Sequence, residues 1–205
     1  MLGLLGLAVA ALAGAAALQW RGLLEVYHLV ELRRDPGQFE AMLLGGGSKE
    51  DAARQFLREP EGKQALFRLY LAEYDRGSSG FNFSTDLLRR AQEGNVTHGS
   101  LVLWENGCSS KTCTDTKGQS SFSVSNLPQD PRRREVILGL LGACVGWTFR
   151  IPELPGIEFQ IQSSKGGKAD PPAWPQDPAP EVSIFGLPTP PEAAQHVCHF
   201  RVLKK

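Results

Sequence analysis

This chain lacks an excess of either charge, and that balance restricts its partners. Its 205 residues carry 22 Lys and Arg against 22 Asp and Glu. Nucleic-acid-binding proteins normally carry a basic patch or stripe, whereas the longest run of one charge here is Arg132–Arg134. We therefore expect no nucleic-acid partner. The run itself predicts a solvated helix start, with a protease processing site as the alternative.

Catalytic signatures are also missing. The chain has no Gly-x-Ser-x-Gly, His-Glu-x-x-His or Cys-x-x-Cys pattern, and no glycine-rich loop ending in Gly-Lys-Ser/Thr. Catalytic groups can still meet in space from distant parts of a sequence, so an enzyme is left without support rather than excluded. We predict no catalytic residue and no cofactor.

The first 19 residues, Met1–Gln19, contain no charged side chain. An apolar core at 2–12 followed by small residues at 13–17 fits a secretory signal peptide, so residues 1–17 are predicted to be removed. No Lys or Arg precedes the core, which departs from that pattern. Because the run approaches the roughly 20 apolar residues of a membrane-spanning helix, an uncleaved anchor is the alternative. Only in that case would a membrane be a partner.

Residues 21–93 have helical patterning. The apolar residues of the first segment are spaced by three and four, which predicts one stripe on a helix, and they are Leu23, Val26, Tyr27 and Val30. Asp35 followed by Pro36 predicts a capped helix start, and Ser48 with Asp51 resembles a capping box. Further helices are expected over 61–74 and 86–93.

Residues 100–205 are richer in strand signals. Runs of alternating or β-branched residues predict short strands at 100–104, 121–125, 157–161, 182–185 and 197–202. A proline-rich connection, 169–191, lies between the candidate strands at 157–161 and 197–202 and contains the one at 182–185. We expect residues 18–205 to form a single α+β domain, with the helical half packed on a small, mostly antiparallel sheet and stabilised by disulfides.

The four cysteines are Cys108, Cys113, Cys144 and Cys198. Behind a signal peptide they predict up to two disulfides, with three possible pairings. Spacing favours Cys108 with Cys113 and Cys144 with Cys198. The alternative is a zinc site that joins cysteines to His196 and His199, but the ligand spacing departs from that of structural zinc sites. We therefore predict no metal.

Two Asn-x-Ser/Thr triplets place candidate N-glycosylation sites at Asn82 and Asn95. Together, these features predict a secreted or luminal glycoprotein that binds an extracellular or luminal protein, or a lipid, without catalysis. One alternative is a membrane-anchored protein of the secretory pathway, for example of the endoplasmic reticulum. Another is a hydrolase whose site gathers His196 or His199 with a serine and a carboxylate.

Overall fold

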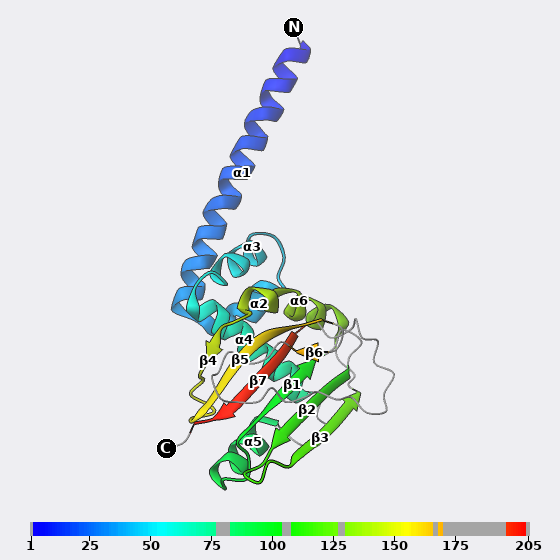
Figure 1. The fold of residues 1–205 in the computed structure, drawn as a ribbon. Helices are drawn as coiled ribbons and strands as arrows, with labels where there is room; N and C mark the ends of the chain where they lie inside the picture. The colour runs from blue at the N-terminus through cyan, green and yellow to red at the C-terminus, as the bar shows by residue number, and fades with distance from the viewer. Residues whose placement is uncertain are drawn as a thin grey trace. The chain divides into compact units, whose positions relative to one another are not determined.

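The computed structural model describes residues 2–76, 83–103, 108–126, 130–165, 168–169 and 196–203. It has the α+β class expected from the sequence, with helices in the N-terminal half and an antiparallel sheet after them (Figure 1). The chain separates into two compact units, Met1–Ala65 and Leu66–Lys205, called unit 1 and unit 2 below. Each unit is described by itself.

Unit 1 begins with an uninterrupted helix, α1, that spans Leu2–Arg34. A 3-10 turn follows at Pro36–Gln38, then α2 at Phe39–Leu43, α3 at Gly47–Phe56, and the first turn of α4, which runs over Pro60–Arg76. The carboxylate of Asp35 accepts a hydrogen bond from the Gly37 backbone N–H, which confirms the predicted cap. The capping box at Ser48 is wrong, because α3 starts at Gly47 and its cap residue is Gly46.

The core of unit 1 lies where α1 packs on α3. From α1, Leu29 and Leu32 are buried, and the rings of Phe39 and Phe56 meet with centroids 6.2 Å apart. Two ion pairs at the surface tie α1 to the following segments, Arg21 to Asp51 and Arg33 to Glu59. Exposed pairs of this kind add little stability, so apolar burial is the main force holding α1 in place.

Unit 2 is built on an antiparallel sheet in the order β3-β2-β1-β7-β5-β4. The strand β7, last in sequence, lies between β1 and β5, and a short β6 pairs with β5. The strands are β1 at His98–Leu103, β2 at Cys108–Thr114, β3 at Ser120–Asn126, β4 at Thr148–Phe149, β5 at Ile157–Lys165, β6 at Lys168–Ala169 and β7 at His196–Val202.

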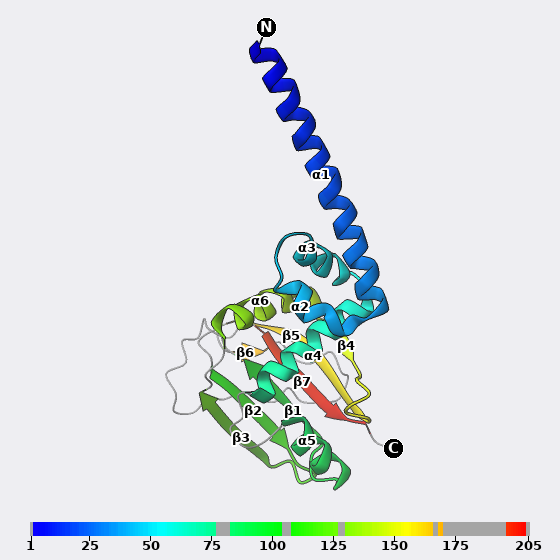
Figure 2. The same cartoon turned by 180° about the vertical axis from the view of Figure 1, so that it is seen from behind.

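One face of this sheet is apolar and is crossed by α4 (Figure 2). Phe67 of α4 stacks on Phe149 with ring centroids 4.5 Å apart, and the Tyr70 hydroxyl donates a hydrogen bond to the Leu101 carbonyl over 3.0 Å. Ile157, Phe159 and Ile161 of β5 are all buried, as predicted for one face of the strand, but Glu158, Gln160 and Gln162 on the other face are buried too. Unit 2 also contains α5 at Phe83–Gln92, α6 at Pro131–Leu141 and a 3-10 turn at Gly142–Cys144.

The arginine run departs from its prediction. The expected helix start is present, with Asp130 as the cap and Pro131 as the first residue, but Arg133 and Arg134 are buried rather than solvated. Arg133 forms a buried ion pair with Glu73 of α4, a partner that local charge patterning could not reveal. A processing site at buried arginines would require local unfolding first.

One strand predicted from the sequence lies outside the described residues, and one strand of the structure was not predicted. The predicted strand at 182–185 and the proline-rich connection, apart from Ala169, lie outside the described residues. Conversely, β2 was not predicted as a strand, because its residues are polar apart from the two cysteines and show no apolar alternation.

Candidate functional site

The most unusual surface of unit 1 is on α1. Five large apolar side chains between residues 20 and 30 are 38–66% exposed, and we call them the exposed α1 face: Trp20, Leu23, Val26, Tyr27 and Val30. Leu29 and Leu32, on the opposite side of the helix, are the residues that pack into the core. The apolar stripe expected from the sequence is therefore present, but it points away from the core of unit 1.

This exposed face is continuous with the uncharged N-terminal run. Residues 2–19 and the packed segment after Arg21 belong to the same helix, with no break between them. Among the residues whose side chains the structure describes, which begin at Ala13, no helix is long and apolar enough to cross a membrane.

The second candidate is a row of polar residues across the sheet of unit 2. Ser100 on β1 and Gln160 on β5 both lie directly opposite His199 on β7, so the three side chains share one face. All three are buried, with exposures of 1%, 4% and 0%. The Ser100 hydroxyl and both ring nitrogens of His199 have no hydrogen-bond partner. Burial lowers the pKa of His199 to about 4, which keeps the imidazole neutral.

A carboxylate lies on the same face but serves another purpose. Glu158 accepts hydrogen bonds from Arg150 over 2.8 Å and from Arg201 over 2.7 Å. Burial alone would raise the pKa of Glu158, but these two arginines hold it below its ordinary value. The Glu158 carboxylate is therefore paired with Arg150 and Arg201, and it does not orient His199.

These contacts bear directly on the hydrolase alternative. A serine nucleophile needs a hydrogen bond to its base, and the base needs one to an orienting group. Ser100, His199 and Glu158 share a face, yet neither of those hydrogen bonds is present. The side chain of His196 lies outside the described residues. The described geometry therefore gives the hydrolase no support.

The cysteines are not joined in the way expected. Cys113, Cys144 and Cys198 are buried and none of the three is in a disulfide, so the Cys144–Cys198 disulfide is not formed here. Cys108 and Cys113 lie in the same extended strand, five residues or about 17 Å apart, which does not fit a bond between them. Burial raises the pKa of the Cys198 thiol well above its ordinary value, so this thiol is unreactive while the protein is folded.

The zinc alternative also finds no support in the described part of the chain. No three His, Cys, Asp or Glu side chains there come close enough to share a metal ion. Cys198 and His199 are neighbours in β7, so their side chains point to opposite faces of the sheet.

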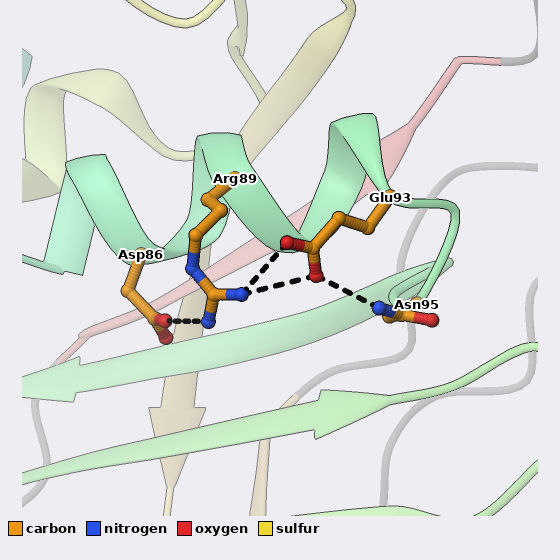
Figure 3. Close-up of polar contacts among 4 residues, drawn as sticks. All are labelled: Asp86, Arg89, Glu93 and Asn95. Atoms are coloured by element: carbon orange, nitrogen blue, oxygen red, sulfur yellow. Dashed lines mark hydrogen bonds and ion pairs between the residues drawn. The ribbon is translucent and has the colours of Figure 1, made fainter.

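Of the two glycosylation candidates, Asn95 is exposed in the turn after α5, and Asn82 lies outside the described residues. The Asn95 amide donates a hydrogen bond to Glu93 over 2.9 Å, and Arg89 bridges Glu93 and Asp86 (Figure 3). The positive charge of Arg89 is therefore balanced by these two carboxylates of the same segment. This arrangement holds Asn95 at the surface without burying its amide nitrogen.

An open pocket of about 520 Å³ lies at one edge of unit 2, where β1 begins and β7 ends. Arg201 is the cation in its lining, and its guanidinium is already engaged by Glu158. The pocket therefore offers no free charge to fix a ligand. Its lining consists of Ala91, Gly94, Val96, Thr97, His98, Thr116, Arg201, Val202 and Leu203.

Sequence reasoning missed the row of Ser100, Gln160 and His199, because which face of a strand is covered depends on distant segments. It found the residues of the exposed α1 face by their spacing, but spacing does not say whether a stripe is covered. Both features have to be interpreted from this chain alone, since no protein-family model, no curated protein and no solved structure matches it.

Proposed function

We propose that this protein is a non-enzymatic binding protein held at a membrane by α1. The observation that supports the proposal is that the uncharged run 2–19 and the packed helix from Arg21 onward form one continuous α1. The catalytic alternative is set aside because His199 has neither a nucleophile nor a carboxylate bonded to it.

The dimensions of the run agree with insertion into lipid. At 1.5 Å per residue, residues 2–19 extend about 27 Å, close to the roughly 30 Å of a bilayer core. Trp20 and Arg21 follow at once, and tryptophan and arginine are both favoured at the boundary between lipid and water. Insertion also explains why the described end of the run has no protein partner, with Leu18 73% exposed.

Cleavage near Ala17 would have a different consequence. It would cut inside α1 and leave Trp20, Leu23 and Tyr27 on the surface of a secreted protein. Large exposed apolar patches normally mark interaction sites or cause aggregation. The secreted glycoprotein expected from the sequence remains the second candidate. The first residue of the mature chain distinguishes it from the membrane-held protein.

The test is alkaline carbonate extraction of membranes from human cells that make the full-length chain with a C-terminal tag. We expect the protein in the pellet, with an N-terminus that includes residues 2–17. Val9→Arg, which puts a charge into the run, is expected to move it to the supernatant. Gly22→Arg, which lies beyond the run at an open position of α1, is the matched control and should stay in the pellet. A secreted chain that starts near Ala16 or Leu18 would overturn the proposal.

A further inference from the structure

The exposed α1 face has the spacing of a helix–helix seam. Trp20, Leu23, Tyr27 and Val30 follow one another by three, four and three residues, which are the first and fourth positions of consecutive heptads. Their exposures are 66%, 65%, 57% and 38%. The core-packing residues Leu29 and Leu32 occupy other heptad positions, so α3 does not cover the seam.

The same register continues into the uncharged run. Counting back in the sequence by fours and threes gives Ala16, Ala13, Val9 and Gly6, which are small or β-branched residues. Helices within a bilayer associate through small residues, whereas helices in water associate through large apolar ones. The change in residue size falls at Trp20, where the uncharged run ends.

Lipid cannot cover all of this seam. Val30 lies 11 residues beyond Gln19, or about 16 Å along the helix, which is outside the hydrocarbon core if residues 2–19 cross it upright. A membrane therefore accounts for the exposure of Trp20, but not for that of Tyr27 and Val30. These two side chains are therefore open to a protein partner.

We propose that this partner is α1 of a second copy of the chain, paired in parallel along the seam. The inference rests on the proposed membrane attachment, because two copies inserted by the same N-terminal run have the same direction and depth. Each seam residue then meets its own counterpart across a twofold axis. The exposed α1 face offers roughly 500 Å² per copy, or about 1,000 Å² in the pair, which is the lower limit expected of a biological interface.

Cross-linking in intact membranes tests the geometry. Tyr27→Cys places a thiol on the seam, and Gly22→Cys places one at an open position on another side of the same helix. With a short bis-maleimide, we expect a cross-linked dimer of the full-length chain for Tyr27→Cys only. The unsubstituted chain measures the background from its own cysteines. Equal yields for the two variants, or a cross-link to a different protein at Tyr27→Cys, would overturn self-pairing.

Disruption of the seam tests its contribution. Two differently tagged full-length copies are co-expressed, solubilised in mild detergent and captured through one tag. We expect Leu23→Asp together with Val30→Asp to reduce co-capture roughly tenfold, because each copy would place two carboxylates in an apolar interface. Unchanged co-capture would contradict the seam. Carbonate extraction of untreated membranes from the same cells distinguishes the two proposals. A monomer that stays in the pellet refutes pairing alone, whereas a chain in the supernatant refutes the attachment.

Discussion

At the centre of β7, the imidazole of His199 is fully buried and neither ring nitrogen has a hydrogen-bond partner. A charged imidazole in that place would be strongly disfavoured, so folding requires the neutral form. The unfolded chain has no such restriction and binds a proton near pH 6.5. The burial of this one side chain therefore links stability to pH.

The link predicts a loss of stability in mild acid. Between about pH 6.5 and pH 4 the unfolded state binds a proton at His199 and the folded state does not, so the free energy of unfolding falls as the pH falls. The contribution is at most roughly 3 kcal/mol over that window. Thermal unfolding of the full chain from pH 7.5 to 4.5 should show this slope, and His199→Phe should flatten it. Parallel curves for the two proteins would show that His199 titrates normally.

Helix caps could be predicted from the sequence, whereas the burial of individual polar side chains could not. The cap at Asp35 was predicted because a cap depends on its immediate neighbours, and Asp130 caps α6 in the same way. The burial of Arg133 was not predicted, because its partner Glu73 is 60 residues away in the chain. For the same reason, nothing local indicated that His199 faces a covered side of the sheet.

Among the elements, α4 and α6 are joined by the buried pair of Glu73 and Arg133. Both side chains are nearly inaccessible to water. Breaking a buried ion pair leaves one charge uncompensated, whereas replacing both charges with apolar groups is often neutral. The pair is therefore a constraint on how the two helices meet rather than a large source of stability.

We expect Glu73→Gln to lower the free energy of unfolding by about 3 kcal/mol, because the guanidinium of Arg133 stays buried without a carboxylate. The double variant Glu73→Leu with Arg133→Met should recover most of that loss. Urea denaturation of the three proteins checks both statements. If the double variant were as unstable as the single one, the pair would be supplying net stability.

The strands were predicted unevenly, for a physical reason. β5 was predicted because Ile157, Phe159 and Ile161 alternate with polar residues, which places the three apolar side chains on one face of the strand. β2 was missed because its polar sequence, with Cys108 and Cys113 five residues apart, suggested a disulfide loop. The order of strands could not be predicted, since the pairing of β7 with both β1 and β5 joins segments far apart in sequence.

At the scale of the whole molecule, the state of the thiols reports on folding. Cys113, Cys144 and Cys198 are buried, and none of them is in a disulfide. We expect these three to resist maleimide in the folded protein and to react in urea without a reducing agent, as counted by intact mass. A mass gain on reduction, together with thiols that react only after it, would show that disulfides form after all.

If α1 holds the protein at a membrane as proposed, glycosylation of Asn95 reports on which side of it the units lie. Asn95 is exposed in the turn after α5. If the units face the lumen, as expected from the sequence, the chain should therefore run faster on a gel after glycosidase treatment. Asn95→Gln should remove the glycan at this position, and Asn82→Gln is the matched control. A membrane-bound chain with no glycan would place the units in the cytosol. That is the side that Arg21, Arg33 and Arg34 favour by the positive-inside tendency.

The central position of β7 has a consequence for the order in which the sheet forms. The strands β1, β2 and β3 can pair as they follow one another in the chain, and so can β4 and β5. The two partial sheets cannot join until β7 enters between them, and such long-range closure is slow. Until then, β1 and β5 each present an open edge that a strand of another molecule could occupy. The newly made chain is therefore at greatest risk of aggregation just before its last strand is in place.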